Sequence, residues 1–146
     1  LPALARQVID ELRTRHPAAA KVAVHAPGDM PAASVDASRV RLLLRNLVDN
    51  ALRHGADAAE PPSVTLTSDA ETVTLEVRDH GPGVPEEQLA HLAQAFYRPD
   101  SARTRAAGGV GLGLYLCRLV AQAHGGSFAV RNAQPGLAVT VTLPPA

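Results

Sequence analysis

The sequence predicts an α+β domain in which one mixed β-sheet is covered by helices on one face. Two observations support this prediction. Apolar residues recur at helical spacing in some segments and alternate at strand spacing in others. These segments follow the order helix–strand–helix, two strands, two helices, two strands, which suits a sheet with helices on one side. No internal repeat or low-complexity linker divides the 146 residues, a length that suits a single core.

The leading segments are predicted from apolar spacing and turn residues. Four apolar residues at helical spacing mark a first helix that ends before Pro17: Leu1, Leu4, Val8 and Leu12. A short strand over 22–24 follows, and the Pro-Gly-Asp sequence at 27–29 turns the chain. Asp36 or Ser38 is suited to cap the next helix, which should end at about Gly55.

The remaining elements are two hairpins with helices between them. Residues 64–66 and 73–77 alternate across a turn at 68–70, which predicts a hairpin. A short helix opens at Pro85, and a last helix runs from about 111 to His124, where Gly125 and Gly126 end it. Strands over 128–130 and 139–143 form the second hairpin. Between the two helices, residues 94–109 have no stable periodicity and are predicted to form a mobile loop.

The bulk composition excludes several classes of protein. Fourteen basic and fourteen acidic residues give a net charge of zero, which argues against a general nucleic-acid or membrane-surface binder. One cysteine excludes a disulfide framework, and Cys117 falls among apolar residues of the last helix, as a core thiol would. No spanning helix or signal peptide is apparent, so an intracellular soluble domain is expected. The histidines lack metal-ligand spacing, which argues against a zinc site.

The helix over 36–55 has a polar flank beside its buried stripe. The stripe is centred on Val40, Leu44, Leu47 and Ala51, and the flank consists of Asn46, Asn50, Arg53 and His54. Asn50 offers an uncharged oxygen suited to magnesium, Arg53 can neutralise phosphate, and His54 can stack or hydrogen-bond near a base. The alternative is that these residues simply form the polar edge of an amphipathic helix.

Asp79 continues the inward parity of Val73, Leu75 and Val77, so its carboxylate should face the buried side of the sheet. A buried carboxylate needs a hydrogen-bond donor, and the exocyclic amino group of adenine is a fitting one. Gly81 and Gly83 would let the backbone approach a flat base closely. The alternative is a Gly-Pro-Gly turn with an acid at the end of a hairpin.

A third glycine-rich segment, 108–113, precedes the last helix. Its amide groups and the helix dipole would attract an anion. The preceding stretch is a loop, which differs from a dinucleotide fold, and no Lys-Ser or Lys-Thr follows, which differs from a P-loop. By itself this segment would equally suit a flexible hinge.

Together these motifs resemble the catalytic, ATP-binding domain of bacterial sensor histidine kinases, within the gyrase, chaperone, histidine-kinase and mismatch-repair ATPase superfamily. Residues 46–51 resemble the N box, 79–83 the first glycine box, 95–98 the F box and 109–114 the second glycine box. Residues 123–126 and 142–144 resemble the end of the family's last helix and its closing strand. The resemblance covers about residues 20–144, and the patterns occur in the family's order.

The resemblance implies a two-layer α/β sandwich, the Bergerat ATP-binding fold, with a flexible lid at 94–109 over MgATP. By position, Asn50 would bind magnesium, Asp79 would bind the adenine amino group and His54 would pack near the base. Asn46 and Arg53 would attend the phosphates, with Asn46 and Arg98 as the catalytic pair. Further nucleotide contacts are implied for Gly81, Gly83, Val84, Arg103, Arg105, Gly109, Val110, Gly111, Leu112, Gly113 and Leu114.

Position 46 discriminates among activities. Hydrolytic members of the superfamily typically have a Glu there to activate water, and Asn46 cannot act as a base. This favours transfer of the γ-phosphate to a histidine, which relies on positioning and charge stabilisation. Two alternatives are an anti-sigma-type serine kinase, which Asn46 disfavours, and a degenerate module that has lost nucleotide affinity.

A complete kinase needs a phosphoacceptor histidine on a dimerising helical hairpin, and no such motif occurs here. Residues 1–19 would be either the end of the connection to that hairpin or a leading helix, with the ATP-binding domain at 20–146. The expected partners are that phosphoacceptor domain and, indirectly, a response regulator. The isolated domain would be a monomer without membrane contact, within a homodimeric kinase whose cytoplasmic part it forms.

Overall fold

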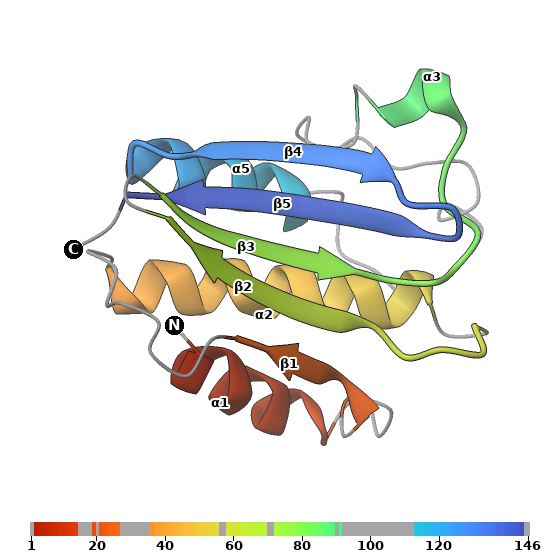
Figure 1. The fold of residues 1–146 in the computed structure, drawn as a ribbon, viewed down its shortest axis with the longest axis horizontal. Helices are drawn as coiled ribbons and strands as arrows, with labels where there is room; N and C mark the ends of the chain where they lie inside the picture. The colour runs from red at the N-terminus through yellow and green to blue at the C-terminus, as the bar shows by residue number, and fades with distance from the viewer. Residues whose placement is uncertain are drawn as a thin grey trace.

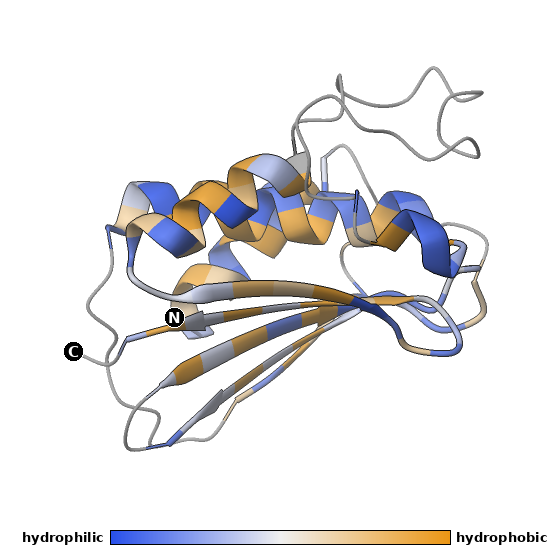
Figure 2. Cartoon of the chain, turned by 90° about the horizontal axis from the view of Figure 1, so that it is seen from above, coloured by the Kyte–Doolittle hydropathy of each residue, from blue (hydrophilic) through white to orange (hydrophobic). Residues whose placement is uncertain are grey.

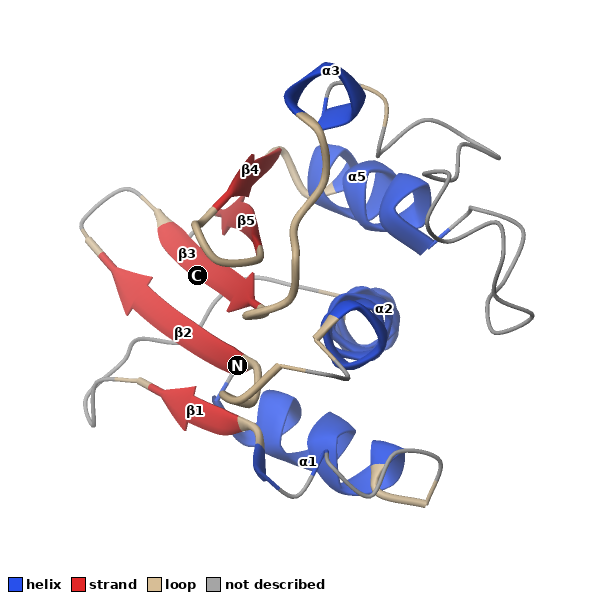
Figure 3. Cartoon of the chain, turned by 90° about the vertical axis from the view of Figure 1, so that its right-hand side faces the viewer, coloured by secondary structure: helices blue, strands red, loops and turns tan. Residues whose placement is uncertain are grey.

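In the computed structural model, the described residues are 2–14, 19, 21–26, 36–55, 58–69, 72–89, 91 and 113–144. They form a five-stranded sheet covered by helices on one face (Figure 1, Figure 3). The elements are α1 (Pro2–Leu12), β1 (Ala23–His25), α2 (Ala37–His54), β2 (Ser63–Ser68), β3 (Val73–Arg78), α3 (Glu86–Leu89), α5 (Gly113–Ala123), β4 (Ser127–Asn132) and β5 (Leu137–Leu143). None of the described helices is long and apolar enough to cross a membrane.

The sheet is mixed, as predicted. Its strand order is β1-β2-β3-β5-β4, with β1 parallel to β2 and every other pair antiparallel. Both predicted hairpins are present, β2 with β3 and β4 with β5. The central strand β3 pairs with β2 on one side and β5 on the other, so the end of β3 lies beside the start of β5.

The central helix α2 begins and ends at predicted capping residues. Of the two candidates, Asp36 is the N-cap, and its side chain accepts a hydrogen bond from the Arg39 amide at 3.2 Å. At the other end the Gly55 amide donates to the Ala51 carbonyl at 2.9 Å. These caps satisfy backbone groups that a helix end otherwise leaves without partners.

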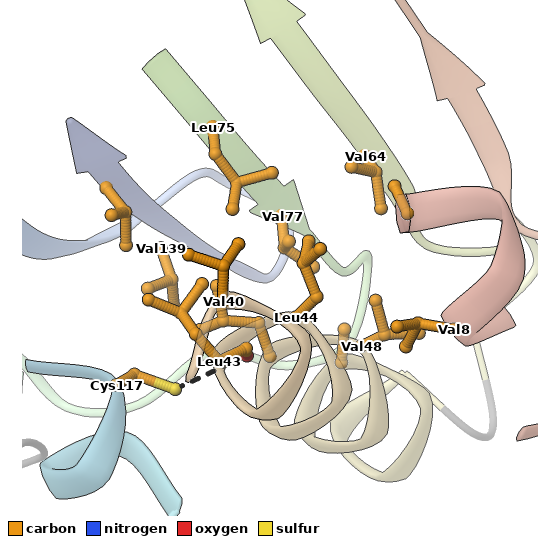
Figure 4. Close-up of a cluster of buried hydrophobic side chains, with 14 of the residues drawn as sticks. Val8, Val40, Leu43, Leu44, Val48, Val64, Leu75, Val77, Cys117 and Val139 are labelled. Atoms are coloured by element: carbon orange, nitrogen blue, oxygen red, sulfur yellow. Dashed lines mark hydrogen bonds between the residues drawn. The ribbon is translucent and has the colours of Figure 1, made fainter. Parts of the chain in front are cut away.

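The core lies between the sheet and the helices α1, α2 and α5 (Figure 2, Figure 4). Val40, Leu44 and Val48 of α2 are buried against inward-facing residues of the strands, such as Leu75 and Val139. The α1 residues Ala5, Val8, Ile9 and Leu12 join the same core. At the surface, the Arg41 guanidinium of α2 lies 2.7 Å from the Glu11 carboxylate of α1.

Several element boundaries differ by one or two residues from those predicted. The first strand covers Ala23–His25 and the short helix begins at Glu86, where 22–24 and Pro85 were expected. The apolar alternation of Val22 and Val24 marks which side chains face inward. The strand's ends are determined by its pairing with β2, where Ala23 lies opposite Ser63 and His25 opposite Thr65.

Cys117 is a core residue, as predicted. Its side chain is completely buried, and its Sγ donates to the Leu43 carbonyl oxygen at 3.6 Å, which links α5 to α2 (Figure 4). Burial raises the pKa of the Cys117 thiol to about 12 from an ordinary value of 9.0. Within the fold the thiol therefore stays protonated at any pH below that range.

This raised pKa makes stability depend on pH under alkaline conditions. Below pH 9 the thiol is protonated in both the folded and the unfolded chain, so it does not change how stability varies with pH. Between pH 9 and 12 only the unfolded state loses the proton, so the free energy of unfolding should fall by about 1.4 kcal/mol per pH unit. Urea titrations should be made at pH 8 and pH 10.5 on the wild type and on Cys117→Ala. Between these two pH values the free energy of unfolding should fall by about 2 kcal/mol more in the wild type than in the variant. Equal losses in the two proteins would contradict this.

Candidate functional site

The polar flank of α2 is present as predicted. Asn46, Asn50, Arg53 and His54 are all half-buried, whereas the neighbouring stripe of α2 is buried. The Nδ2 atom of Asn46 is buried and donates to no described residue. The Arg53 Nε atom lies 3.1 Å from the Asp49 carboxylate one turn earlier. On this flank, Arg53 is therefore a cation paired with Asp49, and Asn46 supplies a buried amide donor.

Asp79 directly follows β3, and its side chain faces the core side, as its parity predicted. It is 2% exposed, and Val73, Leu75 and Val77 on the same side are buried. Its Oδ1 accepts hydrogen bonds from the amides of Gly81, at 2.9 Å, and Leu137, at 3.3 Å. Its Oδ2 accepts none from the described part of the chain. One oxygen thus holds the local backbone, and the other keeps its acceptor capacity.

Two of the predicted motifs meet at the end of α2. A Cβ atom at Gly81 would overlap the His54 carbonyl oxygen, and a Cβ atom at Gly55 would lie 3.4 Å from the Cβ of Asp79. The segment after β3 therefore packs backbone against backbone on the last turn of α2. Beside it, the His80 Nε2 atom lies 3.3 Å from the Glu60 carboxylate.

Two residues that flank the turn between β4 and β5, Asn132 and Gly136, contact the segment after β3 and were not predicted from the sequence. The Asn132 side chain bonds to both backbone groups of Val84, with its Oδ1 accepting from the amide at 3.1 Å and its Nδ2 donating to the carbonyl at 2.7 Å. Gly136 has φ +87°, and a Cβ atom there would overlap the Asp79 carbonyl. Asn-Ala-Gln-Pro-Gly at 132–136 predicts a turn, but its spacing says nothing about which segment that turn contacts.

Several predicted site residues lie outside the described residues: Arg98, Arg103, Arg105, Gly109, Val110, Gly111 and Leu112. Of the second glycine box, Gly113 opens α5 and Leu114 is buried in its first turn. Helix α5 packs beside α2, and both cover the same face of the sheet (Figure 2).

Gly81→Ala should destabilise the domain because the new methyl group would overlap the His54 carbonyl. Relieving that overlap requires backbone movement, so we expect a loss of about 2–3 kcal/mol in the free energy of unfolding, measured by urea titration. Gly125→Ala is the matched control. Gly125 has φ +74° with nothing within 4 Å of an added Cβ, so it should lose only about 1 kcal/mol. Equal losses would mean that the contact with α2 can relax freely.

The chain is similar to sensor histidine kinases in sequence and in fold. The sensor histidine kinase YkoH of Bacillus subtilis is 39% identical over 108 residues, which are 74% of this chain and 23% of YkoH. A mycobacterial sensor histidine kinase, MprB, has a structure with a TM-score of 0.76 and 24% identity, covering 98% of this chain and 94% of that one. Full-length ShkA in complex with AMPPNP gives a TM-score of 0.82 with 26% identity, covering 99% of this chain and 30% of ShkA.

The structural similarity confirms the predicted α+β fold. The chain spans about a fifth of the length of the curated relatives that it matches. Residues 35–146 match the model of a family described as histidine kinase-, DNA gyrase B-, and HSP90-like ATPase. That match covers most of the chain and includes α2, the end of β3 and α5. The chain therefore belongs to the histidine kinase-, DNA gyrase B- and HSP90-like ATPase family.

Proposed function

We propose that this chain is the nucleotide-binding catalytic domain of a sensor histidine kinase. It would bind MgATP and deliver the γ-phosphate to a histidine on a separate phosphoacceptor domain. The observation that carries the proposal is the buried Asp79 carboxylate beside the polar flank of α2. Several relatives that the chain matches are named as histidine kinases, and one similar structure is a complex with AMPPNP.

Asp79 is suited to recognise adenine. Its Oδ1 is held by two backbone amides, so Oδ2 would accept a hydrogen bond from the exocyclic amino group of the base. Gly83 has φ +73°, which a residue with a side chain rarely adopts, and it turns the segment after Asp79. Val84 is buried directly after this turn and would supply an apolar contact for the base.

The flank of α2 is suited to the phosphates. Asn46 and Asn50 are one helical turn apart and therefore lie on the same side of α2. The buried Nδ2 atom of Asn46, which has no partner among the described residues, would donate to a phosphate oxygen. Arg53 adds positive charge farther along this flank, and His54 ends the helix beside the base-binding segment.

The residues present also fit a magnesium ion. An amide oxygen such as that of Asn50 is a hard neutral ligand, and magnesium in nucleotide sites takes few protein ligands because phosphates and water complete its coordination. Asn50 is half-buried, as access to a phosphate-bound ion would require. When bound, magnesium would neutralise phosphate charge and orient the terminal phosphate.

Asn46 distinguishes phosphoryl transfer from hydrolysis. An amide cannot remove a proton from water, whereas an attacking histidine nitrogen brings its own lone pair. In the transfer, the bond from the γ-phosphorus to the β–γ bridging oxygen breaks as a nitrogen–phosphorus bond forms, so the domain's task is positioning and charge stabilisation. Arg98, Arg103 and Arg105, outside the described residues, remain predicted contributors.

The assembly around the domain is part of the proposal. The phosphoacceptor histidine would lie on a dimerisation domain of the same kinase and would pass the phosphate to a response regulator. The kinase would be a homodimer, with this domain in the cytoplasm and monomeric when isolated. The fraction of the relatives that this chain covers is consistent with one module among several.

Asn50→Ala tests the magnesium site. Calorimetric titration of the wild type with AMPPNP should show stoichiometric binding that is stronger with magnesium than without it. The variant should lose this magnesium dependence and keep the wild-type melting temperature, because Asn50 lies on the half-buried flank of α2. Unchanged magnesium dependence would contradict the assignment of Asn50. Absence of wild-type binding at millimolar AMPPNP would contradict the proposed function itself.

Asp79→Asn tests base recognition with almost no change in shape. The amide oxygen can keep the bonds from Gly81 and Leu137, which places an NH2 group where Oδ2 was. A donor would then face the adenine amino group, so ADP affinity should fall about 10–100-fold. GDP, whose guanine has a carbonyl oxygen in place of that amino group, should lose much less affinity. Equal loss for the two nucleotides would show that Asp79 does not recognise the base.

A further inference from the structure

The Asn132 amide pairs with the backbone of Val84 as a neighbouring strand would. It accepts from the Val84 N–H at 3.1 Å and donates to the Val84 C=O at 2.7 Å. Both bonds are satisfied in only one orientation of the amide, since oxygen accepts and NH2 donates. A side chain at the end of β4 therefore holds a segment that precedes it by 48 positions in the chain.

Val84 is the far end of the segment that would carry the base. At the near end, the Asp79 amide donates to the Leu137 carbonyl at 3.0 Å, and the Leu137 amide donates back to Oδ1. The β4–β5 turn thus holds the 79–84 segment at both ends (Figure 1, Figure 3). The turn is also held from β3, since the Arg78 guanidinium donates to the carbonyls of Ala133 and Pro135 at 3.2 and 3.3 Å.

Between these two ends, Gly81 is held by the Asp79 Oδ1 and packs on the last turn of α2, so the part with the fewest contacts is Pro82 and Gly83. Gly81, Pro82 and Gly83 contribute no polar side chain, and Gly83 takes a left-handed conformation with φ +73°. A Cβ atom at Gly83 would lie 2.6 Å from the Asn132 Oδ1, so the turn and the amide fit closely. Without Asn132, the glycines would give the backbone several accessible paths.

We infer that Asn132 is a positioning residue for adenine binding. It acts through Val84 and Gly83, and the inference rests on the proposed nucleotide site. Asn132 holds the 79–84 segment in one backbone conformation before the nucleotide binds. Binding therefore does not have to include the loss of conformational entropy that ordering this segment would cost. Loss of Asn132 should therefore weaken adenine nucleotides at the base end, by the same factor whatever the number of phosphates.

The test compares three variants by calorimetric titration with ADP and with AMPPNP. Asn132→Ala removes both hydrogen bonds. Asn132→Asp keeps the shape but sets a carboxylate oxygen against the Val84 carbonyl. Ser127→Ala is the matched control at the opposite end of β4, where the Ser127 hydroxyl lies 2.6 Å from the Thr142 hydroxyl. We expect both Asn132 variants to bind each nucleotide about tenfold more weakly than wild type, whereas Ser127→Ala should bind with wild-type affinity even if its melting temperature falls.

Amide hydrogen exchange at Val84 supplies a measurement that needs no ligand. Exchange should accelerate in Asn132→Ala, which removes the acceptor of the Val84 N–H, and remain at the wild-type rate in Ser127→Ala. The inference would be overturned if the Asn132 variants bound nucleotide with wild-type affinity. It would also be overturned if the loss of affinity in all three variants simply followed the fall in their melting temperatures. Either result would leave the proposed function standing. Absence of nucleotide binding by the wild type would instead overturn the proposed function, and with it the role of Asn132 in binding.

Discussion

The buried carboxylate of Asp79 constrains much of this domain. A carboxylate in an apolar setting is costly unless hydrogen bonds compensate for lost water, and here two backbone amides bond to Oδ1. One of those amides belongs to Leu137 in β5, so the arrangement requires the register in which Arg78 lies opposite Ala138. A slip of one residue would turn β3's inward face outward and take Asp79 with it. The register between β3 and β5 therefore also determines where the Asp79 carboxylate lies.

The second requirement is the placement of α2. Its last turn meets the segment after Asp79 through a glycine contact that leaves no room for a side chain at residue 81. At the opposite end, the Asp36 amide donates to the His124 Nε2 at 3.0 Å, and the His124 Nδ1 lies 2.9 Å from the Val120 carbonyl. With Nε2 accepting, Nδ1 is the ring nitrogen that donates to the Val120 carbonyl. The N-terminus of α2 is thus tied to the C-terminus of α5, while its C-terminus packs against the base-binding segment.

Local patterns in the sequence predicted the parts of this arrangement that arise from local physics. The alternation along β3 placed Asp79 inward, and helical spacing separated the buried stripe of α2 from its Asn46–His54 flank. Asp36, one of two predicted caps, and Gly55 are the residues at which that helix begins and ends. The role of Asn132 was not predictable, because it depends on which segment a distant turn lies against. Asn132 occurs in an ordinary turn sequence, and only the pairing of β3 with β5 and of β5 with β4 brings it to Val84.

The two ends of the proposed nucleotide site differ in how they would achieve selectivity. At the base end, the Asp79 Oδ1 is buried and bonded to two backbone amides, whereas its Oδ2 accepts no hydrogen bond from the described residues. A base with a carbonyl oxygen at that point would set two acceptors against each other, so rejection follows from repulsion as well as from a missing bond. At the phosphate end, half-buried amides and Arg53 on α2 offer charge and donors that any triphosphate would satisfy. Discrimination between nucleotides therefore belongs to the rigid end of the site.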